Sequence, residues 1–256
     1  MYTNIHKLRE KLQSGQPLFA AGISLCDPIV VEALAETVDL FWIDLEHSPI
    51  NFETLVSHLI AARAGGAPAL VRIPSGDVAW IKRVLDIGAE GIICPQLATV
   101  DSIRQFVSNC RYPPAGTRGF GPRRPTNYGR ISGDAYLEHA NREVFVTVQI
   151  EHVELVDQLD EIVAIDGLDC IAIGPNDLSG TMGKLGKIKD PEVLAVIQKI
   201  IDKSRAAGIP VGVGMGTDLD YARTVLGMGA SWVQCGGDCD YMLQFATQVA
   251  DGVHGR

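Results

Sequence analysis

The chain has 256 residues, with 22 Lys and Arg against 31 Asp and Glu, and a formal net charge of −9. Hydrophobic residues make up 46% and charged residues 21%, a globular balance that excludes a disordered or collagen-like chain. The acidic balance argues against a nucleic-acid partner, which requires a basic patch. No apolar run approaches the roughly 18 residues of a membrane span, so we expect no membrane partner.

Short apolar runs recur along the chain, with amphipathic stretches between them, after a polar N-terminal stretch that predicts a short helix. Each run is nearly continuous in Val, Ile, Leu, Ala or Cys, as in parallel strands that are buried on both faces. The predicted strands lie, in chain order, at 18–23, 40–44, 69–73, 91–95, 145–150, 169–174, 210–214 and 231–235.

The stretches between the strands carry helix start and stop signals. The predicted N-terminal caps are Asp27 before Pro28, Asn51, Asp77, and Asp190 before Pro191. The glycines expected to end helices in the left-handed conformation are Gly65, Gly88, Gly208 and Gly229. Eight strands that alternate with helices predict a (β/α)8 barrel, and about 250 residues is its usual length. No linker divides the chain, so residues 1–256 are expected to form one domain.

Two further features bear on location and assembly. The six cysteines are scattered, and most lie in or beside apolar runs, which indicates reduced thiols of a cytoplasmic protein. The Pro-, Gly- and Arg-rich segment 112–134 has no periodicity, and a connection this long is typical of a functional loop or an oligomer contact. A solvated excursion is the alternative.

The active site of such a barrel lies at the C-terminal ends of its strands. Glu151 and Asp177 follow adjacent predicted strands, so their carboxylates can converge. Two carboxylates without a His or Cys partner favour a hard divalent cation such as Mg²⁺ or Mn²⁺. The alternative, equally open from the spacing, is that each carboxylate caps a helix or pairs with an arginine.

Arg72 and His47 also stand at predicted strand ends. Arg72 interrupts an apolar strand end, where a guanidinium suits an oxyanion or carboxylate, or alternatively a salt bridge to Asp44 or Glu46. His47 can act as a base because it exchanges its proton near neutral pH.

Two other kinds of site are weaker candidates. No predicted strand contains a lysine, so a Schiff-base mechanism lacks its nucleophile and an enolate would need a metal. The glycines at 212–216 and 236–237 resemble the phosphate cradle of many barrels, but they also suit close backbone packing.

Five segments together resemble the HpcH/HpaI aldolase family of metal-dependent (class II) 2-oxo-acid aldolases. They are FWIDLEHSPIN (41–51), ALVRIP (69–74), YPPAGTRGFG (112–121), VQIE (148–151) and IAIGPNDLSGTMG (171–183). The likeness runs from about residue 5 to 250. It implies a (β/α)8 barrel with its last helix exchanged between subunits, assembled as a homo-hexamer that is a trimer of dimers.

The resemblance also implies roles for individual residues. His47 matches the catalytic base, Arg72 the residue that stabilises the enolate, and Asp86 an aspartate that raises the basicity of the histidine. Gln149 and Asn176 match positions that hold the 2-oxo acid. Glu151 and Asp177 match the ligands of a divalent cation, Mg²⁺, Mn²⁺ or Co²⁺, with no organic cofactor. Asp86 lies in the last turn of a predicted helix, which a simple barrel places at the opposite rim.

The expected reaction is the reversible retro-aldol cleavage of a 4-hydroxy-2-oxo acid to pyruvate, or a close 2-oxo acid, and an aldehyde. The nearest alternative is an oxaloacetate decarboxylase or related C–C lyase that passes through the same pyruvate enolate. A non-catalytic barrel that binds a small acid is the alternative from another class.

Overall fold

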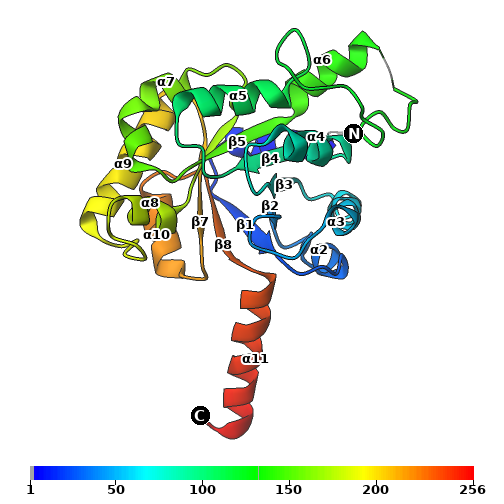
Figure 1. Ribbon diagram of the computed structural model, residues 1–256. Helices are drawn as coiled ribbons and strands as arrows, with labels where there is room; N and C mark the ends of the chain where they lie inside the picture. The colour runs from blue at the N-terminus through cyan, green and yellow to red at the C-terminus, as the bar shows by residue number, and fades with distance from the viewer. Residues whose placement is uncertain (1–2, 132) are drawn as a thin grey trace.

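The computed structural model describes residues 3–131 and 133–256 and consists of a closed barrel of parallel strands in the order β1 to β8 (Figure 1). The strands are β1 Leu18–Ile23, β2 Leu40–Asp44, β3 Ala69–Arg72, β4 Gly91–Cys94, β5 Phe145–Ile150, β6 Cys170–Ile173, β7 Val211–Met215 and β8 Trp232–Gly237. The predicted (β/α)8 barrel is confirmed, and each strand lies within two residues of its predicted ends.

Helices surround the barrel and connect successive strands (Figure 1). They are α1 Thr3–Ser14, α2 Ile29–Leu34, α3 Phe52–Ala64, α4 Val78–Asp86, α5 Val100–Cys110, α6 Asp134–Glu143, η1 Val153–Gln158, α7 Leu159–Val163, α8 Pro175–Thr181, α9 Pro191–Ala206, α10 Leu219–Gly227 and α11 Asp238–His254. The side chains of Asn51, Asp77 and Asp190 cap α3, α4 and α9 as expected.

The predicted helix ends are confirmed at three of the four glycines. Gly88, Gly208 and Gly229 have positive φ angles. The expectation is wrong at Gly65, which is right-handed with φ −76°, because the chain turns one residue later at Gly66, with φ 73°.

The N-terminal helix closes the end of the barrel where the strands begin. Glu90, just before β4, accepts hydrogen bonds from the backbone N–H groups of Asn4 (3.0 Å) and Ile5 (2.8 Å) in the first turn of α1. Arg9 of α1 pairs with Asp169, just before β6, at 2.8 Å. The opposite end, where the strands finish, is therefore the one left for a functional site.

Two tryptophans and two glycines fill the middle of the barrel. The rings of Trp42 and Trp232 lie 5.8 Å apart. A Cβ atom on Gly212 would stand 1.9 Å from the Trp232 ring, and one on Gly214 3.4 Å from Gln234 Oε1. These contacts explain both glycines by close packing, the alternative to a phosphate cradle.

The segment between α5 and α6 packs against the body of the protein. Arg118 is buried and pairs with Asp86 at 2.7 Å. Arg124 is buried and donates hydrogen bonds to the carbonyls of Ile87 (3.3 Å) and Leu59 (3.5 Å). Leu59 lies in α3 and Ile87 directly follows α4, so Arg124 supports these two helices.

The C-terminal helix α11 projects away from the barrel (Figure 1). Its large exposed apolar side chains are Met242, Leu243, Phe245, Val249 and Val253. Such a contiguous apolar surface is typical of a contact with another protein. In the part of the chain that the structure describes, no helix is both long enough and apolar enough to span a bilayer.

Substitution of Gly212 tests the packing at the barrel centre. Gly212→Ala should lower the free energy of unfolding by about 3 kcal/mol, because the methyl group overlaps the rigid Trp232 ring. Urea denaturation measures the change. Gly216→Ala is the matched control, since no atom lies within 4 Å of its added Cβ. Equal stability of the two variants would contradict this account of the interior.

Candidate active site

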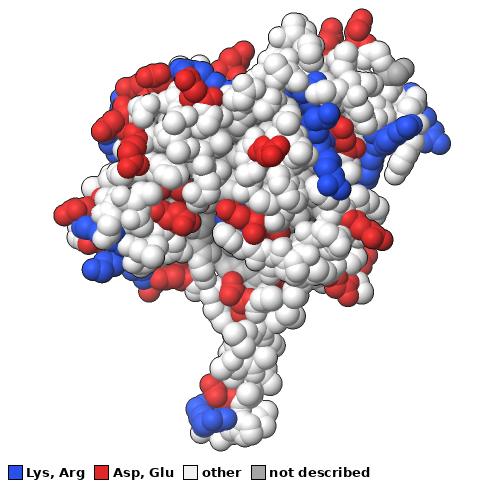
Figure 2. Space-filling model, viewed as in Figure 1, with Lys and Arg blue, Asp and Glu red and all other residues white. Residues whose placement is uncertain are grey.

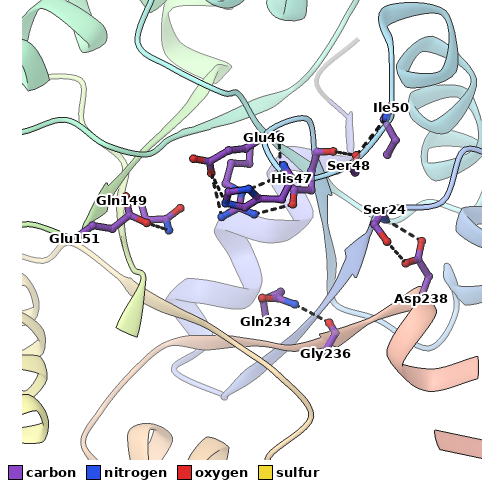
Figure 3. Close-up of polar contacts among 12 residues, drawn as sticks. Ser24, Glu46, His47, Ser48, Ile50, Gln149, Glu151, Gln234, Gly236 and Asp238 are labelled. Carbon is purple, nitrogen blue, oxygen red and sulfur yellow. Dashed lines mark hydrogen bonds and ion pairs between the residues drawn. The ribbon is translucent and has the colours of Figure 1, made fainter. Parts of the chain in front are cut away.

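Acidic side chains gather at the end of the barrel where the strands finish. Figure 2 shows acidic atoms around a hollowed area just above the projecting helix α11. The labelled side chains in the close-up come from the loops after β1 and β2, from the end of β5, from β8 and from the start of α11 (Figure 3). The expected position of the site therefore coincides with a concentration of charge.

Asp44 and Arg72 form the central ion pair of this region. They are register partners at the ends of β2 and β3. Arg72 donates through Nε to Asp44 Oδ1 (3.0 Å) and through Nη2 to Asp44 Oδ2 (2.6 Å), a two-point contact that fixes the plane of the guanidinium. Its Nη1 lies 3.2 Å from Glu46 Oε2, and its Cζ lies 5.2 Å from the centroid of the Trp42 ring.

Asp44 also shapes the loop that carries His47. Its Oδ1 accepts the backbone N–H groups of Glu46 (2.9 Å) and His47 (3.3 Å), and its carbonyl accepts the Ser48 hydroxyl. The His47 side chain is 67% exposed, and its Nε2 lies 3.6 Å from Glu46 Oε2 (Figure 3). His47 is thus open to an incoming molecule on a backbone that Asp44 holds.

Glu151 is a buried carboxylate directly after β5. It is 1% exposed, and its Oε2 accepts the backbone N–H of Gln96 at 2.9 Å. Its Oε1 accepts a hydrogen bond from the amide of Gln149 (Figure 3). A Cβ on Gly174 would stand 2.6 Å from Glu151 Oε1, so only glycine allows this approach.

Burial raises the pKa of Glu151 to about 7, and the negative charges of Asp177 and Glu46 add to the shift. Burial also raises the pKa of Glu46, while the Arg72 and His47 charges oppose that shift. The mouth of the barrel therefore holds more negative charge than Arg72 balances.

Asp177 and Asn176 lie in the first turn of α8, directly after β6, and both are exposed. No hydrogen bond or ion pair joins Asp177 to another residue within the described ranges. The sequence left open a helix-capping or arginine-paired role for Glu151 and Asp177, and neither contact is present in these ranges.

The donor set fits a hard divalent cation. Glu151 and Asp177 repel each other electrostatically, and the oxygen of the buried Gln149 amide has no hydrogen-bond partner. A cation that is coordinated by oxygen would relieve both features. Residues 3–131 and 133–256 contain no group of three or more His, Cys, Asp or Glu arranged to hold a metal, so water and substrate would have to complete the coordination.

Asp86 contacts the segment between α5 and α6. It is in the last turn of α4, and its Oδ1 accepts a hydrogen bond from Arg118 at 2.7 Å. Among the described residues no hydrogen bond or ion pair joins it to His47. The role that the resemblance implies for Asp86 stays a prediction.

Sequence reasoning missed two contributors to the site. Asp44 was considered only as a partner of Arg72, although it also holds the loop of His47. Gln96 supplies a backbone N–H to Glu151 from a left-handed conformation, φ 57°, which is uncommon for a residue other than glycine. Its position directly after β4 was the available signal.

The buried charge of Glu151 predicts a pH-dependent effect on the metal-free protein. Its folded-state pKa of about 7 exceeds the ordinary glutamate value of 4.5, so its ionisation destabilises the fold as pH rises through 7. In EDTA at pH 8, Glu151→Gln should stabilise the protein by about 2 kcal/mol. Avoiding the ionisation should contribute on the order of 3 kcal/mol. Loss of the Gln96 hydrogen bond should cost about 1 kcal/mol of this gain.

At pH 5 the same substitution should give no stabilisation, because the carboxyl group is still protonated in the folded state and only partly ionised in the unfolded state. The resulting difference of about 1 kcal/mol is offset by the lost Gln96 hydrogen bond. Thermal unfolding of both proteins at the two pH values measures the difference. The exposed Glu53→Gln on α3 is the control. A Glu151→Gln variant that is less stable than the parent at pH 8 would contradict the prediction.

Comparison with known proteins identifies the family of the chain. The family model described as HpcH/HpaI aldolase/citrate lyase matches residues 19–244. The 5-keto-4-deoxy-D-glucarate aldolase of Shigella boydii serotype 18 is 33% identical over 96% of this chain and 95% of its own length. The hydroxypyruvate/pyruvate aldolase of Pseudomonas aeruginosa is 32% identical over 96% and 92%.

Solved structures agree as well. A HpcH/HpaI aldolase/citrate lyase family protein from Burkholderia cenocepacia superposes with a TM-score of 0.89 at 32% identity, covering 96% of this chain and 98% of its own. The HpcH/HpaI aldolase of Desulfitobacterium hafniense gives a TM-score of 0.87 at 29% identity, covering 96% of both chains. The chain therefore belongs to the HpcH/HpaI aldolase/citrate lyase family and is a carbon–carbon lyase.

Proposed function

We propose that this lyase catalyses the divalent-metal-dependent, reversible retro-aldol cleavage of a 4-hydroxy-2-oxo acid to pyruvate, or a close 2-oxo acid, and an aldehyde. The observation that carries the proposal is the cluster of Glu46, Arg72, Glu151 and Asp177, whose charges act on one another beside the exposed His47. Such a cluster offers oxygen ligands, a cation for an oxyanion, and a base.

Arg72 is the residue that stabilises negative charge. A guanidinium has five N–H donors. Nε and Nη2 each donate one to Asp44, Nη1 lies 3.2 Å from Glu46 Oε2 without a hydrogen bond to it, and the remaining N–H groups are available for an enolate oxygen. Since the two-point contact with Asp44 fixes the guanidinium, no reorganisation is needed when the charge develops.

His47 acts as the base that removes the proton from the 4-hydroxyl group, after which the C3–C4 bond breaks. Its exposed ring can reach an incoming substrate, and its Nε2 lies 3.6 Å from Glu46 Oε2. The same imidazolium can return the proton. Asp86 would raise the basicity of His47 only through a contact that residues 3–131 and 133–256 of one chain do not make.

Glu151 and Asp177 would hold the divalent cation, Mg²⁺, Mn²⁺ or Co²⁺, and Gln149 and Asn176 would hold the 2-oxo acid. When bound, the cation supplies a Lewis acid that polarises the 2-oxo group of the substrate. Gln149 fixes the Glu151 carboxylate through its amide N–H, and its buried amide oxygen has no partner among the described residues. No organic cofactor is needed for these steps.

The lysines support this route over a Schiff base. No strand contains a lysine, and six of the eight are held by hydrogen bonds or ion pairs outside the barrel, namely Lys7, Lys11, Lys184, Lys189, Lys199 and Lys203. A Schiff-base aldolase needs a buried lysine that can reach the carbonyl.

The surface of α11 supports assembly with further copies of the chain. We propose a hexamer, a trimer of dimers, in which α11 is exchanged between subunits and covers its exposed apolar residues. Analytical ultracentrifugation should then give six times the mass of the chain. The six unpaired cysteines support a cytoplasmic location.

Metal dependence is tested with the wild-type enzyme and a 4-hydroxy-2-oxo acid. Exhaustive EDTA treatment should abolish pyruvate release, and Mg²⁺, Mn²⁺ or Co²⁺ should restore it, because two carboxylates bind a hard cation only modestly. Lactate dehydrogenase and NADH follow pyruvate. Full activity of a sample in which elemental analysis detects no metal would refute the proposal. Binding without turnover of any such acid would favour a non-catalytic barrel.

The roles of His47 and Arg72 are separated by a second reaction. His47→Ala should lower kcat for aldol cleavage by about 10²–10⁴, the range for loss of a general base. Oxaloacetate decarboxylation requires no proton from a 4-hydroxyl, so this variant should retain more of it. Arg72→Ala should impair both reactions, since both pass through the enolate. Equal losses in the two reactions for His47→Ala would exclude the role given to it.

A further inference from the structure

Gln234 is a polar side chain in the barrel interior to which no role has been given so far. It lies on β8, in register with Ala20 of β1 and Gly214 of β7. A Cβ on Gly22 would stand 2.9 Å from its Nε2, and a Cβ on Gly214 3.4 Å from its Oε1. The amide therefore occupies space that two glycines on the neighbouring strands leave open.

This amide lies close to the proposed enolate site. A Cβ on Gly214 would also meet the Trp42 ring at 3.7 Å, and the Arg72 guanidinium lies over that ring. Gln234 and the ring that lies under Arg72 therefore both border the space above Gly214. Figure 3 shows it between Gln149 and Glu151 on one side and Ser24 and Asp238 on the other.

The hydrogen-bonding capacity of Gln234 is only partly used. Its Nε2 donates to the carbonyl of Gly236 at 2.6 Å. Because a carbonyl can only accept, this contact fixes which end of the amide is nitrogen. Among the described residues no hydrogen bond is made to Oε1. Gln234 therefore presents an oriented acceptor, and one further N–H, to the interior.

The proposed metal ligands and Gln234 lie on different sides of the barrel mouth. Glu151 and Asp177 follow β5 and β6, whereas Gln234 is on β8, next to β1. A substrate with its 2-oxo acid end at Glu151 and Asp177 can extend its other end, which becomes the aldehyde, toward Gln234.

The charges of the mouth disfavour a second carboxylate on that aldehyde. Asp44, Glu46, Glu151 and Asp177 surround Arg72, whose guanidinium already pairs with Asp44 and Glu46. The buried loop arginine Arg124 is held by α3 and the end of α4 instead. With Glu151 and Asp177 engaged by the divalent cation, no arginine or lysine among the described residues of the mouth is left to pair with a carboxylate on the aldehyde, while a neutral hydroxyl group could use the free Gln234 amide.

We propose that Gln234 determines the aldehyde specificity of the enzyme and selects a short, neutral hydroxyaldehyde. This inference rests on the proposed aldolase function. Gln234 receives the hydroxyl group of the aldehyde at Oε1, while its hydrogen bond to Gly236 keeps the amide in place. An apolar aldehyde of equal size leaves that acceptor unpaired and binds less well.

The test compares aldol additions of pyruvate, with metal present, to three aldehydes: glycolaldehyde, the isosteric but apolar propanal, and the acidic glyoxylate. Wild-type kcat/KM should be highest for glycolaldehyde. Gln234→Leu should lower the glycolaldehyde-to-propanal ratio of kcat/KM about 10-fold, the effect of one lost hydrogen bond. Gln234→Met, with an unbranched side chain, should give the same change, and the exposed Gln105→Leu none.

The ratio for two aldehydes does not depend on the fraction of folded enzyme, so partial unfolding of a variant cannot imitate the effect. A ratio that stays the same in both Gln234 variants would overturn the inference, and so would a wild-type preference for glyoxylate. Oxaloacetate decarboxylation involves no aldehyde and should persist in the variants. A wild-type enzyme that neither adds pyruvate to any aldehyde nor decarboxylates oxaloacetate would instead refute the proposed function, and the inference with it.

Discussion

The ion pair between Asp44 and Arg72 determines the geometry of the whole barrel mouth. It joins the ends of two neighbouring strands, and the same carboxylate accepts the backbone N–H groups of Glu46 and His47. A two-point contact between arginine and carboxylate restricts both the position and the plane of the guanidinium. Because one aspartate fixes both the Arg72 guanidinium and the loop of His47, these two groups keep a constant relation to each other.

Glu151 shows the cost of such a site to the stability of the fold. A buried carboxylate with a pKa raised to about 7 is unfavourable for a folded protein without a cation, and Gln96 adopts a left-handed backbone conformation while donating to it. Strain and unbalanced charge of this kind concentrate where a ligand is bound. A dissociable cation would balance the charge of Glu151 when it is bound, which would account for this arrangement.

The sequence predicted the barrel well because eight buried parallel strands leave a strong pattern of apolar runs, and the caps at Asn51, Asp77 and Asp190 are local signals. It placed Arg72, Glu151 and Asp177 at the correct rim for the same reason, since strand ends fix which residues meet. Contacts between distant segments leave no such signal. Three features depend on tertiary packing in this way: the left-handed conformation at Gly66 instead of Gly65, the hydrogen bonds from Asp44 to the His47 loop, and the burial of Arg124.

The interior glycines connect the packing of the barrel to its chemistry. Gly212 admits the Trp232 ring, and the absence of side chains at Gly22 and Gly214 admits the Gln234 amide one layer nearer the mouth. Trp42 connects the lower layer to the mouth, since its ring lies against Trp232 and under Arg72. A change in the lower layer would therefore displace Trp42 and, with it, the guanidinium. The same close packing that stabilises the barrel thus fixes the distance between the proposed enolate site and the side chain that we assign to the aldehyde.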